Sequence, residues 1–434
     1  MIELASYIPR PAVFDSGTSV LELIPAPDAE AVFRRLAGQP HCVYLDSARR
    51  DPRLGRYSFV TADPFDFVTL PTLADCASRS RPDPFTILQR RLGHLTTDTL
   101  PDLPPFQGGA AGLFSYDLAH DLERLPRPRF DEFGTSAMAV GLYDVVIAFD
   151  HLTKRAWIIS QGFPEVEPTR RRRRAIKRLE QFYIYLRGTS GEAANGESLD
   201  RTRPAHDAIA QEATEETEKG ITDSVFSLSS VSSCAINSAA HNSRGQLSAA
   251  DLAPKYPVER LSDNLMGRLT SSFSAEQYLA AVGRAIEYIH AGDVFQVNLA
   301  QRLLHPATSD PVSLYLRLRR RNPATFGGYF DLGEFQIASA SPERFLKVRG
   351  GEVEARPIKG TRRRTARPEA DLFAGDELRE SEKDIAENVM IVDLLRNDLS
   401  RVCRPESVVV SELCRLETYE FVQHLVSVVR GRLR

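Results

Sequence analysis

The chain has 434 residues, of which 42% are hydrophobic and 26% charged, a balance typical of folded proteins in water. Its net charge of -3 argues against a general nucleic-acid-binding protein. No stretch approaches the ~20 apolar residues of a membrane span, and the start lacks the pattern of a signal peptide. The five cysteines form no CxxC pair, which favours reduced thiols in the cytoplasm over disulfides or a zinc site.

Residues 1–186 are predicted to form a first folded region. An apolar face of Ile176, Leu179, Phe182 and Leu186 predicts a helix at its end. The arginine run that leads into this helix leaves two interpretations open, a solvated helix face, which is the commoner case, or an RNA-binding arm. Four runs rich in β-branched and aromatic residues predict strands; they are HCVYL, RYSFV, YDVVIAFD and RAWIIS.

Residues 187–270 are predicted to be a disordered or low-complexity insertion, with room for one or two short helices. Segments such as GTSGEAANGESLDRTRP are rich in small and polar residues. Between Gly188 and Thr270 the only aromatic residues are Phe226 and Tyr256. Such a composition cannot bury enough apolar surface to offset the entropy lost on ordering.

Regular structure is predicted to return at residue 271. Ser274 with Gln277 has the spacing of a helix capping box, and Gly292 ends the apolar stripe that follows. The same spacing at Ser381 opens a second helix, and a Gly-Gly turn joins two of the predicted strands. These strands are VFQVNLAQRLL, FQIASAS, RFLKVRG, EVEARPI and YEFVQHLVSVVRGRL. The mixture predicts an α+β fold with large, mostly antiparallel sheets.

One lysine, Lys359, lies in the stretch ARPIKGTRRRT, among five arginines that reach from Arg356 to Arg367. A nucleophilic lysine must be neutral, and neighbouring positive charge favours the neutral amine. Pro357 and Gly360 indicate a tightly held backbone around it. On these residues alone, a structural or surface lysine remains the better interpretation.

Three acidic side chains and one histidine are further candidates. Glu343 follows a predicted strand and can serve as a general acid, although a salt bridge with an arginine is the commoner case. Asp384 and Glu387 share one helix face and could hold a hard cation such as Mg²⁺, although surface helices often carry such pairs. His424 lies in an apolar run, where a hydrogen-bonded core histidine is more common than a catalytic one.

Five motifs, in this order, resemble the chorismate-utilising enzymes, which include component I of anthranilate synthase and of aminodeoxychorismate synthase. The motifs are GDVFQVNLAQR, SASPERF, RPIKGT, AENVMIVDLLRNDLSRV and VQHLVSVVRG. The resemblance covers about residues 5–186 and 272–434. It implies a β-sandwich core surrounded by helices, with 1–186 as the family's N-terminal region and 271–434 as the chorismate-binding catalytic region.

Within this family, PIKGT is typical of aminodeoxychorismate synthases, whereas anthranilate synthases typically read PIAGT. The stretches AEN and NPATFGGYFDL point to the same branch. This branch implies a transferase of the transaminase class that makes 4-amino-4-deoxychorismate from chorismate and ammonia, for 4-aminobenzoate and folate biosynthesis. A separate glutamine amidotransferase subunit would supply the ammonia. Anthranilate synthase component I and a non-catalytic subunit that docks an amidotransferase remain the alternatives.

The resemblance also assigns roles to individual residues. Lys359 would attack C2 of chorismate, and Glu343 would protonate the leaving C4 hydroxyl. Glu387, together with Asp384, would hold Mg²⁺ on a substrate carboxylate. Further substrate contacts are implied for Gly360, Thr361 and His424. A tryptophan pocket is an open alternative at six matching positions, which are Ser47, Arg56, Tyr57, Thr325, Phe326 and Gly327.

Relatives continue beyond the VRGRLR that ends this sequence, with closing strands and further Mg²⁺-binding glutamates. The resemblance therefore predicts an incomplete catalytic region with an open sheet edge, and little synthase activity from this chain alone.

Overall fold

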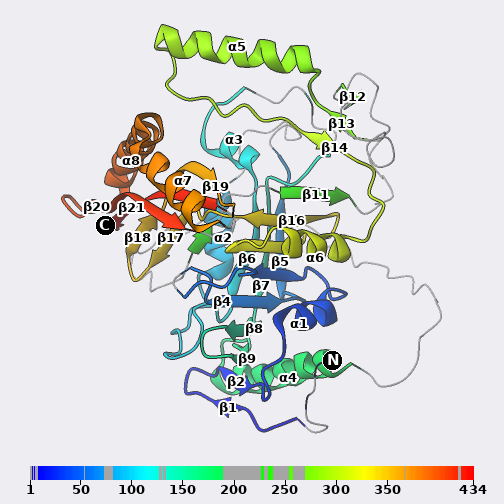
Figure 1. Ribbon diagram of the computed structural model, residues 1–434. Coiled ribbons are helices and arrows are strands. Elements are labelled where there is room, and N and C mark those ends of the chain that lie inside the picture. Colours follow the sequence, from blue (N-terminus) through cyan, green and yellow to red (C-terminus); the bar gives the residue numbers. More distant parts are fainter. Residues whose placement is uncertain are drawn as a thin grey trace.

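The computed structural model describes residues 8–52, 54–72, 82–126, 130, 133–188, 226–228, 233–237, 254–257, 269–365, 367–418 and 422–434, together with Ile2 and Leu4. Within these ranges the strands form four sheets, and helices pack on the larger ones (Figure 1). The strand pairings are antiparallel, so the predicted α+β fold with large antiparallel sheets is confirmed. No helix in these ranges has the length and apolar character needed to cross a bilayer.

The largest sheet has nine strands in the described part of the chain. In spatial order they are β1 (Ala12–Val13), β2 (Ser19–Glu22), β9 (Arg155–Ser160), β8 (Val145–Asp150), β4 (Tyr57–Thr61), β3 (Val43–Asp46), β15 (Phe326–Asp331), β16 (Phe335–Ser341) and β11 (Ser233–Asn237). Gly327 lies opposite Asp46 in the β3–β15 pairing. The two predicted folded regions therefore contribute strands to one sheet, and the four strands predicted in the first region are confirmed.

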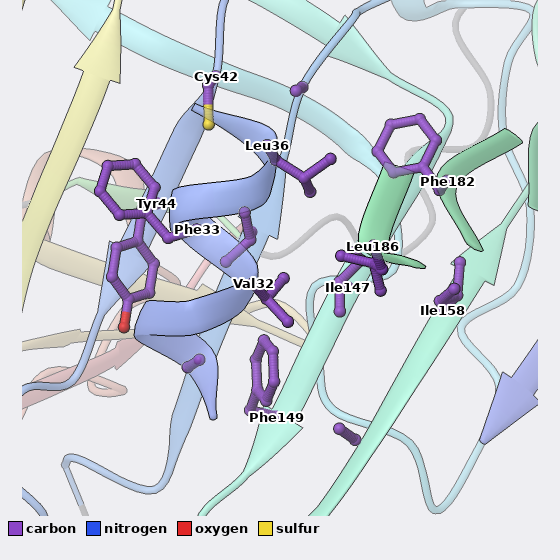
Figure 2. Packing of buried hydrophobic residues seen from close by; sticks show 14 of the residues in the cluster. Val32, Phe33, Leu36, Cys42, Tyr44, Ile147, Phe149, Ile158, Phe182 and Leu186 are labelled. Atoms are coloured by element: carbon purple, nitrogen blue, oxygen red, sulfur yellow. The ribbon is translucent and has the colours of Figure 1, made fainter. Parts of the chain in front are cut away.

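Helices α1 (Ala29–Leu36), α4 (Pro168–Arg187) and α6 (Pro311–Arg321) contribute buried residues to the main apolar core of this sheet. Figure 2 shows those of α1 and α4, among them Phe33 and Phe182. The side chain of Asp28 begins α1 by accepting a hydrogen bond from the N–H of Ala31. Phe33 of α1 stacks on Tyr44 of β3 with ring centroids 4.9 Å apart. Each fully buried side chain of this size contributes about 1.5–3 kcal/mol. The core therefore fixes β3, the strand that leads into the predicted tryptophan pocket.

The predicted helix at the end of the first region is α4, and its apolar face is buried as expected. Its arginines divide between two environments. Arg172 and Arg173 are exposed, whereas Arg178 is 8% exposed and bonds Asp144, which is 0% exposed. The sequence could not show this division, because Asp144 is the residue between β7 and β8 and does not lie on the helix itself.

A second sheet of six strands carries most of the candidate residues. It consists of β10 (Phe226–Leu228), β17 (Leu346–Arg349), β18 (Glu352–Ala355), β19 (Ile358–Arg363), β20 (Val409–Thr418) and β21 (Val422–Arg432). Strands β18 and β19 follow each other along one side of β21, and β20 lies along the other side. Helices α7 (Pro368–Glu380) and α8 (Glu382–Val402) pack on this sheet, and Ser381 caps α8 as predicted.

Two smaller sheets complete the described structure. One contains β5 (Asp66–Leu70), β7 (Met138–Tyr143) and β6 (Gly109–Phe114). Leu88 of α2 (Pro84–Leu92) and Leu118 of the 3-10 helix η2 (Tyr116–Leu118) pack against it, and α3 (Ala119–Leu122) follows η2. The other contains β12 (Tyr256–Pro257), β13 (Thr270–Ser271) and β14 (Leu303–Leu304). Most of the predicted insertion 187–270 lies outside the described residues, although β10, β11 and β12 fall within it.

The region after residue 271 contains one wrong prediction. Helix α5 (Ala275–Ala291) has the predicted capping box and ends at Gly292, which adopts a left-handed conformation. The following run VFQVNLAQRLL was predicted to be a strand, but in it only Leu303–Leu304 pairs with another strand. Phe295 within the run is 60% exposed. Apolar alternation alone does not form a strand, because a strand also needs a neighbour to satisfy its backbone.

Candidate active site

The pairing of β19 with β21 places Lys359 and Thr361 beside the strand that carries His424. Lys359 lies opposite Leu425, Thr361 lies opposite His424, and the register shifts between Lys359 and Thr361. Gly360 sits in this bulge with φ +74°. A left-handed residue in a bulge is the position that favours glycine, because a Cβ there is strained. The bulge therefore changes the direction of the side chains on either side of it.

Helices α7 and α8 both lie close to Gly360. A Cβ on this residue would lie 2.9 Å from Cδ1 of Leu378 and 3.0 Å from Cβ of Asp384. Both contacts are tighter than Cβ atoms normally make, so a side chain here would require the Leu378 side chain of α7 and Asp384 of α8 to move. Glycine thus serves both the bulge and the close packing of α8 against Lys359.

The Lys359 amine contacts a carboxylate on α8. Its Nζ lies 3.3 Å from Oε1 of Glu387, and the two side chains are 26% and 34% exposed. Such partly exposed ion pairs contribute about 0–1 kcal/mol. The contact matters for where it puts the lysine rather than for stability.

Glu343 follows β16 and reaches the start of β19. Its Oε1 accepts a hydrogen bond of 3.0 Å from the N–H of Ile358. The Ser341 hydroxyl fixes its backbone by donating to the Glu343 carbonyl at 2.8 Å. Burial raises the pKa of Glu343, and the bond from Ile358 and the charge of Lys359 oppose that rise. A carboxyl group that holds its proton more firmly than usual suits general acid catalysis.

His424 on β21 faces Thr361. Its Nδ1 lies 2.9 Å from the Thr361 hydroxyl oxygen. Burial lowers the pKa of His424, a hydrogen bond with the Gly360 backbone opposes this, and the positive charge of Arg49 lowers it further. The imidazole is therefore neutral at pH 7 and can exchange hydrogen bonds with Thr361 without adding charge.

The arginines around Lys359 are compensated by carboxylates. The sequence suggested that the arginine charges favour a neutral lysine. In the structure, three of these arginines form ion pairs with carboxylates. The pairs are Arg356–Glu417 at 2.6 Å, Arg362–Glu377 at 3.0 Å, Arg362–Asp384 at 3.1 Å and Arg364–Asp371 at 3.0 Å. Among the ion pairs of the described residues, the partner of the Lys359 amine is the Glu387 carboxylate.

Comparison with known proteins identifies the family of this chain. The family model described as chorismate binding enzyme matches residues 73–434, which is most of the chain. The chain belongs to the chorismate binding enzymes. The candidate residues of β16, β19, α8 and β21 all lie within the matched range.

Individual relatives include both branches of this family. Anthranilate synthase component 1 of Thermus thermophilus is 34% identical over 81% of this chain and 60% of its own length. Aminodeoxychorismate synthase component 1 of Klebsiella aerogenes is 31% identical over 94% of this chain and 74% of its own length. The crystal structure of anthranilate synthase component I from Streptococcus pneumoniae shares the fold with a TM-score of 0.59 and 24% identity, over 89% of this chain and 70% of that chain. The chain thus spans about 60–75% of these relatives' lengths.

The carboxylates assigned to Mg²⁺ do not form a metal site by themselves. Asp384 binds Arg362 at 3.1 Å, and Glu387 contacts Lys359. No group of three or more His, Cys, Asp or Glu side chains suited to a metal occurs among the described residues. Mg²⁺ prefers six oxygen ligands, so one carboxylate beside an amine does not fit this ion without further donors.

The residues assigned to the tryptophan pocket come together where β3 ends and where β4 and β15 begin. The Ser47 hydroxyl lies 2.7 Å from the Tyr57 carbonyl and 3.2 Å from the Thr325 carbonyl. Arg56 binds Asp150 at 2.6 Å and lies over the Tyr57 ring. The remaining two residues of the six begin β15 and are Phe326 and Gly327. Polar groups of this cluster are thus already engaged with the chain itself, and tryptophan binding stays a prediction.

Two residues beside the candidate site were not recognised as such from the sequence. Asn388 and Ser427 are both 0% exposed; Asn388 directly precedes the apolar run VMIV, and Ser427 stands inside the apolar run LVSVV. The triplet AEN had served only to indicate a branch of the family. A polar side chain on the buried face of a helix is the signal that could have identified Asn388, because such groups require hydrogen-bond partners.

Proposed function

We propose that this chain carries the catalytic lysine of an aminodeoxychorismate synthase, which converts chorismate and ammonia to 4-amino-4-deoxychorismate. The supporting observation is that the Lys359 amine lies 3.3 Å from Glu387 and that its charge also acts on the half-buried Glu343, whose pKa burial raises. Family membership supports chorismate as the substrate, and relatives such as the Klebsiella aerogenes protein carry the name of this activity.

In the proposed reaction the neutral amine of Lys359 forms a bond to C2 of chorismate. The ring double bonds shift, and the C4–oxygen bond breaks. Glu343 donates its proton to the departing hydroxyl, which leaves as water, so burial of this carboxyl serves the step. Ammonia then bonds to C4, the double bonds shift back, and the lysine leaves C2. Thr361, on the strand of Lys359, and His424, opposite it on β21, are proposed to orient the substrate.

The proposal also includes a metal ion and a partner subunit, neither of which takes part in the bond changes described above. Mg²⁺ would need oxygen donors beyond Glu387, and when bound it would neutralise a substrate carboxylate. A glutamine amidotransferase subunit would supply ammonia, and an ammonium salt replaces it in an assay.

The test is a single-turnover reaction with the chain in excess over chorismate and with an ammonium salt and Mg²⁺. Mass spectrometry of the Lys359 peptide detects the covalent intermediate, and an added lyase converts the product to 4-aminobenzoate. Lys359→Ala should abolish both signals, whereas Lys383→Ala, which removes an exposed lysine of α8, should change neither. Unchanged C4 amination by Lys359→Ala would sink the assignment of the nucleophile.

Anthranilate synthesis is the second candidate, because the Thermus thermophilus relative named for it is 34% identical. Anthranilate is fluorescent and needs no lyase. A fluorescent product in the same reaction would therefore replace the proposed activity with this one.

A further inference from the structure

Asn388 lies inside the interface between α8 and β21, one residue after Glu387. Its side chain is fully buried. The Nδ2 donates to the carbonyl of Leu425 at 3.2 Å, and the Oδ1 accepts a short hydrogen bond from the hydroxyl of Ser427. Both functional atoms of the amide are therefore used, and both bonds go to the same strand.

The residues that Asn388 binds are those that hold the lysine strand. Leu425 is the register partner of Lys359. The backbone N–H of Ser427 donates to the carbonyl of Pro357 at 3.2 Å, just before β19 begins. The hydroxyl of Ser427 in turn accepts from the N–H of Cys414 on β20 at 2.9 Å. The Asn388 side chain thus connects α8 with three neighbouring segments of the sheet, at the level of Lys359.

Helix α8 carries Glu387 and Asn388 side by side, so both lie close to Lys359 and its register partner. Asp384, one turn earlier, packs against Gly360 and binds Arg362, so it fixes the first turn of α8 on β19. Residues four apart lie on one helix face, which places Asn388 on the same side as Asp384. Glu387 lies between these two anchors, and its own contact with Lys359 is too exposed to hold the helix.

We infer that Asn388 is a positioning residue, which holds α8 so that the Glu387 carboxylate stays against the Lys359 amine. A role of Asn388 in catalysis rests on the proposed function. The contact itself is a property of the fold and can be measured without chorismate. Loss of either hydrogen bond of Asn388 lets α8 shift or rotate, and the two side chains then separate.

A zero-length cross-link measures this contact directly. A water-soluble carbodiimide activates a carboxylate, and an amine in contact displaces the activated group, forming an amide while the reagent leaves as a urea. Mass spectrometry of digested protein gives the yield of the Lys359–Glu387 link. The reference in the same sample is the link between Lys347 and Glu354, which are register partners on β17 and β18 and whose charges interact. The ratio of the two yields separates a local shift from general loss of structure.

Asn388→Ala and the isosteric Asn388→Asp, which removes the donor to Leu425, should each lower this ratio at least threefold. Ser427→Ala removes one of the two bonds and should lower it less. Asn397→Ala removes an exposed amide from the same helix and should leave it unchanged.

An unchanged ratio in folded Asn388→Ala or Asn388→Asp overturns the inference. A parallel decrease of both links also overturns it, because the residue would then serve general stability. If Asn388→Ala does not fold, Asn388→Asp and Ser427→Ala decide. None of these results depends on turnover, so a failure of the proposed function appears in the Lys359→Ala experiment alone.

Discussion

Gly360 allows a sharp quantitative test, because Gly351 provides a matched control in the same sheet. Both residues have nearly equal backbone angles, with φ +74° and φ +72°. A Cβ on Gly351 would meet nothing within 4 Å, whereas a Cβ on Gly360 would meet Leu378 at 2.9 Å and Asp384 at 3.0 Å. The left-handed conformation costs an alanine about 1–2 kcal/mol at either position. Overpacking adds about 1–3 kcal/mol at Gly360 alone. Gly360→Ala should therefore cost about 2–5 kcal/mol and Gly351→Ala about 1–2 kcal/mol.

Urea unfolding of both variants, followed by circular dichroism, measures these free energies. The entropy that alanine removes from the unfolded chain is the same in both variants and cancels in the difference. Equal losses of stability would refute the argument that α7 and α8 press against Gly360. In the cross-linking assay, Gly360→Ala should also weaken the Lys359–Glu387 link, because the added carbon pushes α8 away from β19.

Other predictions concern buried charge and pH. Arg178→Ala leaves Asp144 buried with a weaker partner and should cost about 3–5 kcal/mol in urea unfolding, whereas Arg155→Ala, in an exposed ion pair, should cost far less. Burial lowers the pKa of His151 to about 4. The contribution of His151 to stability should therefore be present above pH ~6.5 and lost as the pH falls toward 4. His151→Asn should flatten this part of the curve of unfolding free energy against pH. Burial raises the pKa of Glu343, so its contribution is present below pH ~4.5 and lost as the pH rises through the raised pKa; Glu343→Gln should remove that slope, and an unchanged slope would contradict the burial argument.

Local signals in the sequence predicted local structure well. Ser274 and Gln277 form the predicted capping box, and Ser381 caps α8, because a cap depends on a few neighbouring residues. The Gly350–Gly351 turn is likewise confirmed, with both residues at positive φ.

Long-range partners were beyond the reach of the sequence. Arg356 binds Glu417, a residue 61 positions away, so a stretch that reads as a basic patch is largely compensated in the fold. The motif comparison brought Lys359, Glu343 and Glu387 into one hypothesis, but their distances come from the bulge at Gly360 and from the burial of Asn388. Neither the direction of a side chain after a bulge nor the partner of a buried amide follows from periodicity.

The pairing of β3 with β15 has a consequence for how the chain folds during synthesis. These neighbours in space are separated by about 280 residues in the sequence. At translation rates of ~5–20 residues per second, β3 waits roughly 15–55 s before β15 is made. Throughout that interval one edge of β3 lacks its final partner and is open to pairing with another chain.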